Sequence, residues 1–263
     1  MKSKRIAIPY IIWMIIFTVV PLAMVAYYAV TNKQGELSFE PMMKILIYKD
    51  AFIRSLIIAF ISTAICLIIA YPLAYIMSRC RANARRTTVM LIMLPMWMNF
   101  LLRIYSWMML LQDGGIISNI ISFFGIKATL LGNSGAVVLG MVYNFLPFMV
   151  LPLYTVMLKI DNSIIEAAND LGANTLRTFS KVIIPLSVPG IISGITMVFV
   201  PAASTFLVST YLGGPNDMLI GDIIQKEFPI SRNVGSAMSL VLMVIMLIFI
   251  GVMNKFGDEE AIF

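Results

Sequence analysis

The side chains that could carry out chemistry are scarce in this sequence of 263 residues, and those present favour binding over catalysis. Histidine is absent, which excludes a Ser-His-Asp triad, histidine-ligated zinc and histidine proton relays. Cys66 and Cys80 form no CxxC pair, so their spacing predicts neither a metal site nor a disulfide. The GxxxxGK[ST] pattern of phosphate-binding loops does not occur. We therefore expect a protein that is not an enzyme and binds no metal and no cofactor itself.

A short polar segment, residues 159–181, is the strongest candidate for a functional site. Ser163 and Glu166 fit a capping box, and Gly172 fits the left-handed residue that ends a helix. A helix from Ile164 to about Leu171 would be roughly 12 Å long, too short to cross a bilayer. Its polar face is acidic, whereas helices that lie on membranes are usually basic there. Either the segment docks on a cationic partner, or Glu166 is only a cap and the alanines are only small.

The flanking segments must position this helix, and their composition indicates a membrane. The chain is 60% hydrophobic and 12% charged, against about 25% charged in soluble domains, and its mean hydropathy is +0.93. We predict an all-α polytopic membrane protein with one transmembrane domain over residues 1–263, surrounded by membrane lipid. The first segment is expected to remain as an anchor, because no small-residue cleavage pattern follows it. The six predicted transmembrane helices are residues 9–30, 55–76, 89–111, 136–158, 182–211 and 234–253.

The distribution of basic residues predicts the orientation. The run RCRANARR, residues 79–86, follows the second predicted span and is the densest basic cluster. Lys2, Lys4 and Arg5 precede the first span, on the same predicted side. Because short basic loops stay in the cytoplasm, we expect both termini and segment 159–181 to be cytoplasmic. The net charge of +6 then reflects topology, and no nucleic acid is expected as a partner.

Several predicted spans are interrupted by proline, which removes a backbone donor and tends to kink a helix. The fifth span is the most interrupted, and we expect it to bend around a translocation path. Gly190 and Gly194 form a GxxxG pattern in that span, which permits close helix contact. The prolines in or at the ends of spans are Pro72, Pro95, Pro147, Pro152, Pro185, Pro189 and Pro201.

The acidic segment resembles the EAA loop of permeases of ATP-binding-cassette (ABC) importers. That pattern is EAA, three residues, Gly, nine residues and then Ile-x-Leu-Pro. This chain has Glu166-Ala167-Ala168, then Gly172, and after nine residues the run VIIP, residues 182–185, with conservative replacements. The resemblance implies a coupling helix that docks into a cytosolic ATPase. The coupling residues that it implies are Glu166, Ala167, Ala168, Asp170 and Gly172.

Longer stretches, over roughly residues 55–235, resemble the first permease subunit of spermidine/putrescine importers. They are LPMWMNFLLRIYSWMMLLQDGGIIS, YNFLPFMVLPLYTVMLKIDNSIIEAANDLGA and PAASTFLVSTYLGGPNDMLIGDIIQKEF. The resemblance implies a MetI-like fold of type I importers in a bacterial inner membrane, and polyamine transport without chemistry by this chain. It also implies a second homologous permease, two ATP-binding subunits that use ATP and Mg, and an extracytoplasmic polyamine-binding protein. The alternatives are another solute, such as ferric ion, thiamine or an opine, and less favoured an ion channel or an intramembrane enzyme.

For a polyamine, aromatic and amide side chains could provide a low-affinity path. A cation–π contact is worth about 0.5–2 kcal/mol, enough to guide a cation and too weak to trap it. No Asp or Glu lies well inside a predicted span, so selectivity is expected mostly in the external binding protein. Interfacial anchoring or helix packing is the alternative for each ring. The residues expected along the path are Trp97, Asn99, Tyr105, Tyr143, Asn144 and Tyr211, with Trp107 as a further aromatic face.

Charges near the outer side complete the candidates. Arg103 is the one charge deep in a predicted span, where charges are functional candidates. A cation is a poor ligand for a polycation, so we expect a gating or structural role, with Asp113 or a carbonyl of the partner permease as its partner. The carboxylates of the outer loops could dock a binding protein or attract substrate, or simply be solvated. They are Asp113, Asp217, Asp222 and Glu227.

Overall fold

The computed structural model describes residues 8–32, 34–124, 129–215 and 217–260, and they are mostly helical. Within these residues, backbone bridging of the β type is limited to one isolated pair, Thr31 with Leu37. The all-α prediction is therefore confirmed. The helices are α2 (Ile8–Met14), η1 (Ile15–Val19), α3 (Val20–Ala29), α4 (Glu40–Lys44), η2 (Ile45–Tyr48), α5 (Lys49–Arg79), α6 (Ala82–Trp97), α7 (Phe100–Leu111), α8 (Ile116–Phe123), α9 (Ser134–Met157), α10 (Asn162–Asp170), α11 (Thr175–Thr178), η3 (Phe179–Ile183), α12 (Ile184–Ser204), α13 (Leu207–Leu212), α14 (Ile220–Ile230) and α15 (Arg232–Glu260).

Within the described residues, five helical segments are long and apolar enough to cross a membrane, and a bent pair, residues 82–97 with 100–123, makes a sixth if it is counted as one span. The five correspond to the first, second, fourth, fifth and sixth predicted spans. They are Ile8–Ala29, Glu40–Arg79, Ser134–Met157, Thr175–Ser204 and Arg232–Gly257.

The third predicted span, 89–111, is not one continuous helix. Helix α6 ends at Trp97, α7 begins at Phe100, and the pair is bent by 90°. Met98 and Asn99 have extended backbone, and the Asn99 side chain accepts a hydrogen bond from the Leu101 amide at 2.8 Å. A proline near the end of α6 and a helix cap at Asn99 thus replace the straight span that hydropathy alone predicts.

The fifth predicted span, 182–211, also ends early. Helix α12 stops at Ser204, Thr205 is extended, and the separate helix α13 follows. Gly221 at the start of α14 packs against this break, since a Cβ atom there would lie 2.7 Å from the Thr205 carbonyl oxygen. The expected bend is therefore a true interruption at the carboxyl end of α12.

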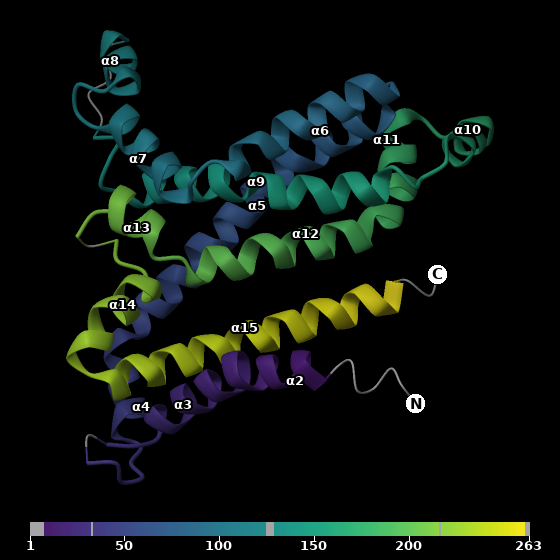
Figure 1. Cartoon of the computed structure of the whole chain (residues 1–263). Helices are drawn as coiled ribbons and strands as arrows, with labels where there is room; N and C mark the ends of the chain where they lie inside the picture. Colours follow the sequence, from purple (N-terminus) through teal and green to yellow (C-terminus); the bar gives the residue numbers. More distant parts are fainter. Residues whose placement is uncertain (1–7, 33, 125–128, 216, 261–263) are drawn as a thin grey trace.

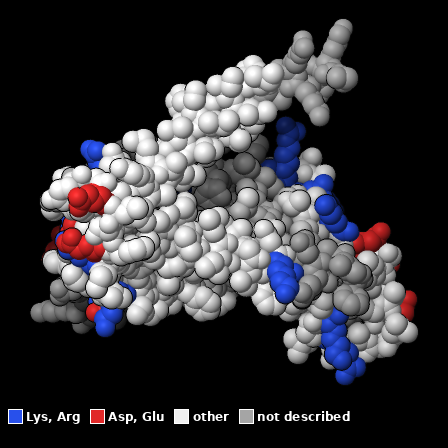
Figure 2. Space-filling view, turned by 90° about the horizontal axis from the view of Figure 1, so that it is seen from below, with Lys and Arg blue, Asp and Glu red and all other residues white. Residues whose placement is uncertain are grey.

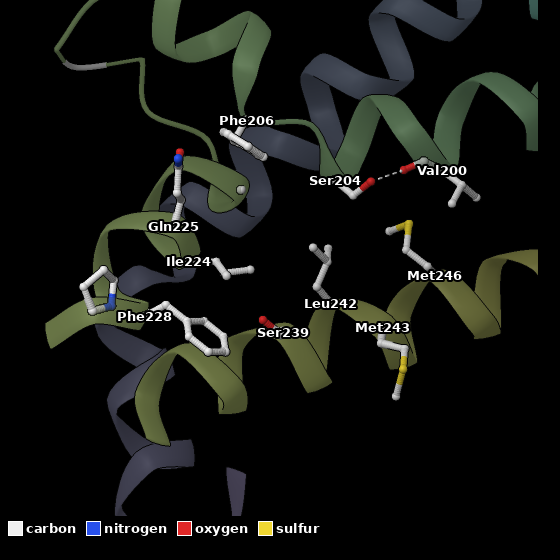
Figure 3. Close-up of a pocket in the computed structure, with 12 residues that line it drawn as sticks. Val200, Ser204, Phe206, Ile224, Gln225, Phe228, Ser239, Leu242, Met243 and Met246 are labelled. Carbon is white, nitrogen blue, oxygen red and sulfur yellow. Dashed lines mark hydrogen bonds between the residues drawn. The ribbon is translucent and has the colours of Figure 1, made fainter. Parts of the chain in front are cut away.

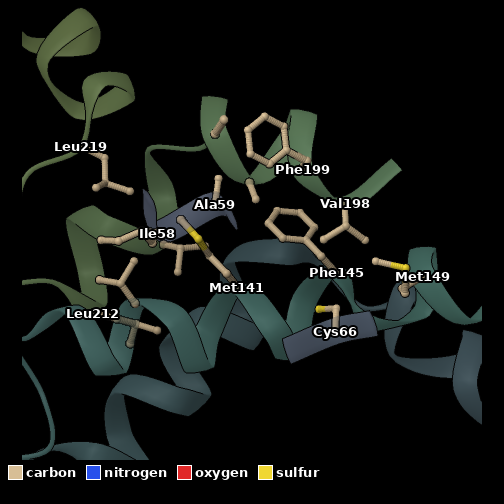
Figure 4. Close-up of a cluster of buried hydrophobic side chains, with 14 of the residues drawn as sticks. Ile58, Ala59, Cys66, Met141, Phe145, Met149, Val198, Phe199, Leu212 and Leu219 are labelled. Atoms are coloured by element: carbon tan, nitrogen blue, oxygen red, sulfur yellow. The ribbon is translucent and has the colours of Figure 1, made fainter. Parts of the chain in front are cut away.

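Helices α5, α9 and α12 form the centre of the bundle, where small side chains let the backbones approach. Figure 4 shows Cys66 of α5, Met149 of α9 and Val198 of α12 in this buried cluster. A Cβ atom at Gly190 would lie 3.1 Å from Cβ of Val156, and one at Gly194 would lie 2.6 Å from Sδ of Met149. The close contact expected of the GxxxG pattern is therefore present, between α12 and α9.

Polar and charged groups gather at the two ends of the bundle. The start of α2, the end of α15 and the short helices α10 and α11 lie at one end, and α8, α13 and α14 lie at the other (Figure 1). On the face drawn in Figure 2, the charged side chains lie toward the two ends, and a broad uncharged band separates them. This is the arrangement expected of a chain that crosses a bilayer. Lys2, Lys4 and Arg5, which contribute to the predicted orientation, lie outside the described residues.

Candidate functional site

The predicted coupling helix is present as α10, but it begins earlier than expected. Asp161 is the N-cap residue, and its side chain accepts a hydrogen bond from the Ser163 amide at 3.1 Å. This hydrogen bond to the carboxylate lowers the pKa of Asp161. The predicted capping box of Ser163 with Glu166 is therefore wrong, because Asp161 caps the helix and Ser163 lies inside it.

The end of α10 is formed by Gly172, as predicted. Its φ is +79°, the left-handed region that glycine adopts without a steric penalty. The Gly172 amide donates to the Asn169 carbonyl at 2.9 Å, and the Ala173 amide donates to the Ala168 carbonyl at 3.0 Å. This pair of bonds is a Schellman motif, and it stops α10 and turns the chain toward α11.

The outward surface of α10 combines acidic and apolar groups. Glu166, Ala167 and Asp170 are exposed, and Glu166 and Asp170 form no ion pair with any described residue. Just past the helix, the Leu171 side chain is 89% exposed and that of Leu176 is 77% exposed. An exposed apolar rim beside unpaired carboxylates favours a protein partner that supplies both a socket and cations. The geometry therefore suits docking, and no described group of three His, Cys, Asp or Glu residues could hold a metal ion here or elsewhere.

The predicted path residues fall into separate places. Tyr105 of α7 meets Tyr211 of α13 with ring centroids 4.9 Å apart. Trp107 of α7 meets Tyr143 of α9 at 5.4 Å. These two edge-to-face pairs place the aromatic rings between α7 and its neighbours, so helix packing accounts for part of their surface.

The other three predicted path residues are not joined to these pairs. The Trp97 side chain, at the end of α6, is 77% exposed. Asn99 is the cap of α7. Asn144 is buried, and its Nδ2 donates to the Gly140 carbonyl at 2.8 Å, while its Oδ1 has no hydrogen-bond partner among the described residues. One chain by itself therefore does not bring the six residues together into a continuous lining.

Arg103 is buried in α7 without a counter-ion among the described residues. Its side chain is 6% exposed, and its guanidinium carbon lies 5.4 Å from the centre of the Phe100 ring. Nε and Nη1 have no acceptor within the described parts of the chain. The expected ion pair with Asp113 is absent, since Asp113 lies exposed beyond the end of α7. An acceptor supplied by a partner chain remains a prediction.

Three of the four carboxylates that were predicted to lie on outer loops form hydrogen bonds with neighbouring elements, which the sequence did not indicate. Asp217 accepts a hydrogen bond from the Ser134 hydroxyl. Asp222 is buried and accepts from the Leu219 amide at 2.8 Å and from the Thr210 hydroxyl. Glu227 accepts from the Tyr48 hydroxyl at 2.8 Å. These groups join loops and helices at the end of the bundle that carries α13 and α14, so they are not simply solvated.

A cavity of about 600 Å³ lies between the end of α12, α14 and α15, away from the predicted path residues. Figure 3 shows Ile224, Phe228 and Leu242 around it. Its lining is mostly apolar, and its few polar side chains are Ser204, Gln225 and Ser239. Sequence patterning gave no sign of this cavity, because it forms only where α14 and α15 pack beside the end of α12.

Comparison of the sequence with known proteins finds components of membrane transport systems. Residues 67–257 match the protein family described as "binding-protein-dependent transport system inner membrane component". The spermidine/putrescine transport system permease protein PotB of Haemophilus influenzae is 38% identical over 263 residues, which cover 95% of this chain and 92% of that protein. PotB of Escherichia coli K12 is 34% identical and covers 89% of this chain and 90% of its own length.

Solved structures agree on the fold. A bacterial ABC transporter that imports the acidic polysaccharide alginate superposes with a TM-score of 0.78 at 17% identity, covering 98% of this chain and 95% of that one. The MetNI methionine ABC transporter in an inward-facing conformation gives a TM-score of 0.59 at 20% identity, covering 84% and 96%. At these identities the likeness concerns the fold, and the expected MetI-like architecture is confirmed.

Proposed function

The chain belongs to the family of binding-protein-dependent transport system inner membrane components, and we propose that it is the permease subunit of an ATP-driven importer of polyamines. The observation that carries the proposal is its 38% identity to a spermidine/putrescine permease over nearly the whole of both chains. As a member of an inner-membrane transport family, the chain is a transport subunit rather than a catalytic one.

ATP hydrolysis is assigned to a separate subunit that docks on α10. The sequence has no phosphate-binding loop of its own. Helix α10 offers exposed Glu166 and Asp170 beside the exposed Leu171 and Leu176 side chains, which suits a basic, partly apolar socket. In this assignment Ala167 and Ala168 let the partner approach closely, and Gly172 sets the angle at which α10 leaves the bundle.

The assembly that we propose contains this chain, a second homologous permease, two ATP-binding subunits and an external polyamine-binding protein. One neighbour in fold is an alginate ABC transporter in complex with a periplasmic protein that carries alginate, which supports an external partner by analogy. The end of the bundle that carries α8, α13 and α14 is the face for that partner. Both chain ends and α10 lie on the cytoplasmic side in this assignment, which the shared position of α2, α15 and α10 supports (Figure 1).

The translocation path runs along α7 and is completed by the second permease. Two aromatic pairs, Tyr105 with Tyr211 and Trp107 with Tyr143, offer ring faces to a passing ammonium group. A second permease chain would supply the carboxylates that the apolar spans of this chain lack and an acceptor for Arg103.

Uptake of labelled spermidine and putrescine, in cells from which this chain has been deleted and then restored, tests the proposal. We expect uptake of at least one polyamine to disappear and to return with the wild-type chain. Unchanged polyamine uptake together with lost uptake of ferric ion, thiamine or an opine would instead assign the same machine to another solute. Accumulation of the permeant cation tetraphenylphosphonium, which follows the inside-negative membrane potential, serves as the control for the energetic state of the cells.

A further inference from the structure

Three side chains on the inner end of α5 lie on one helical face. Tyr71, Tyr75 and Arg79 are spaced four residues apart, which places them above one another along the helix. We call them the α5 stripe. The segment that carries α10 leaves the bundle after α9 and returns to it before α12, and it contacts this stripe on both passes.

On the outgoing pass, the contact is made by Arg79. Its Nη1 donates to the Ile160 carbonyl at 3.2 Å and to the side-chain oxygen of Asn162, the first residue of α10. The guanidinium carbon lies 5.6 Å from the centre of the Tyr75 ring. Nε and Nη2 are enclosed and have no acceptor among the described residues. Both hydrogen-bond acceptors that the described residues offer to the Arg79 guanidinium therefore lie near the start of segment 159–181.

On the returning pass, the contact is made by Phe179. Its ring meets those of Tyr71 and Tyr75 edge to face, with centroids 5.5 Å and 5.9 Å apart. The Tyr71 hydroxyl lies 2.7 Å from Oγ of Ser187 in α12. Thr178 donates to the side-chain oxygen of Asn169 at 3.3 Å, which ties the end of α10 to this pass.

The opposite end of α5, near its amino terminus, is also held by hydrogen bonds. The Ile220 amide of α14 donates to Oγ of Ser55 at 2.7 Å, and Tyr48 just before α5 donates to Glu227. With 31 residues α5 is about 46 Å long, enough to reach across a bilayer. The helix is continuous over this length, with Pro72 inside it, and a continuous helix held at both ends can carry a displacement from one side of the membrane to the other.

We propose that the α5 stripe is where movement of α10 enters the membrane bundle, with Arg79 as the principal positioning residue. This inference rests on the proposed function, since it takes α10 as the docking site of the ATPase. Without the stripe, α10 could still dock and the ATPase could still turn over, but the displacement would not reach α14. If the stripe only stabilised the fold, its loss would instead reduce assembly, ATP hydrolysis and uptake together.

The test uses the full importer, reconstituted in proteoliposomes with its ATP-binding subunits and binding protein. ATP hydrolysis and spermidine uptake are measured in the same preparation for Arg79→Gln and for Asn162→Ala. Arg81→Gln is the matched control, because Arg81 is an exposed arginine two residues further along the chain, just past the end of α5. Coupling between sites corresponds to about 5- to 150-fold, so we expect uptake per ATP hydrolysed to fall at least about fivefold in both variants and to stay unchanged in the control.

The double variant Arg79→Gln/Asn162→Ala sharpens the result. Because the two residues share one contact, we expect uptake per ATP hydrolysed to fall no further in the double variant than in the worse single variant. Should Arg79→Gln fail to assemble, Asn162→Ala and Tyr71→Phe decide the matter, since each leaves the guanidinium in place.

Wild-type uptake per ATP in Asn162→Ala, or an equal fall of uptake and hydrolysis in every variant, would overturn the inference. Failure of the proposed function would look different, because the wild-type chain itself would then retain no ATP-binding subunit, or would retain one and take up no spermidine.

Discussion

The carboxylates at the two ends of the bundle are used in opposite ways. At the end that carries α13 and α14, which we propose to be the outer end, Asp217, Asp222 and Glu227 each accept a hydrogen bond from another element of the same chain. At the end that carries α10, Glu166 and Asp170 are exposed and form no ion pair with described residues. Satisfied carboxylates stabilise a fold, whereas unsatisfied ones on a short exposed helix are available to a partner. The carboxylates at the outer end therefore stabilise the chain itself, whereas those of α10 are the groups that our proposal assigns to docking.

The largest effect on stability is expected at the outer end, for Asp222→Ala. The substitution removes the acceptor for the Leu219 amide and the Thr210 hydroxyl in a site where Asp222 is 2% exposed. Leu219 is buried, so leaving its amide unsatisfied costs about 1–3 kcal/mol, whereas Thr210 is exposed and adds little. Thermal unfolding of the purified protein in detergent measures this loss of stability. The matched control is Asp113→Ala, an exposed outer carboxylate, which should change stability by less than about 0.5 kcal/mol. Equal effects of the two variants would remove the contrast between the ends.

The largest effect on assembly is expected at the opposite end, for Glu166→Lys. Glu166 is exposed, so the stability of the isolated chain should hold within about 0.5 kcal/mol. Reversing a charge that pairs across an interface should weaken capture of the ATP-binding subunit by about 30-fold or more. Affinity purification with quantified subunit ratios measures this capture. Asp113→Lys is the matched charge reversal at the outer end. Full capture by Glu166→Lys would contradict the assignment of α10 as the docking helix.

A smaller effect is expected from the backbone at the end of α10. Gly172 has φ of +79°, and an added Cβ atom there meets nothing within 4 Å, so the cost of Gly172→Ala is conformational, about 1–2 kcal/mol. Hydrogen exchange at the Gly172 and Ala173 amides should accelerate as the Schellman motif weakens. Gly251 lies inside α15, and an added Cβ atom there also meets nothing within 4 Å. We therefore expect Gly251→Ala to stabilise the fold by about 0.5–1 kcal/mol, because alanine favours the helix over glycine.

The smallest effect is a pH dependence at the start of α10. The hydrogen bond from the Ser163 amide lowers the pKa of Asp161 below its ordinary value of 3.8. A carboxylate whose pKa is lower in the folded state stabilises that state fully above its unfolded pKa, and the contribution is lost as pH falls through the folded pKa. Below about pH 4 the first turn of α10 should therefore fray, which a spin label on Ala167 would report. Asp161→Asn keeps a capping side chain and should abolish this pH dependence.

The spans and the end of α10 were predictable from the sequence, because they depend on local composition. Apolar runs of sufficient length identify membrane helices, and Gly172 follows an amphipathic run at the position where a left-handed residue ends a helix. The bend at Met98 and Asn99 was missed, since hydropathy averages over a window and ignores a proline followed by a capping residue.

Other features could not be predicted because they depend on pairs that are distant in the sequence. Asp161 and Ser163 are both good N-cap residues, and the fold selects Asp161, with Arg79 holding the next residue, Asn162. Arg79 belongs to a basic run that the orientation rule explains completely, so nothing in that run marks it for a specific contact. The burial of Asp222 likewise follows from the break between α12 and α13, which brings Thr210 to it.

Site-directed crosslinking from position 167 tests the central claim most directly. In a Cys80→Ser background, where the remaining Cys66 is buried, the Ala167→Cys variant would be crosslinked in intact membranes that contain the whole importer. We predict a covalent product with an ATP-binding subunit, and no labelling by a membrane-impermeant thiol reagent added from outside the cell. Labelling of the introduced thiol from outside, or a product with the external binding protein, would contradict the account.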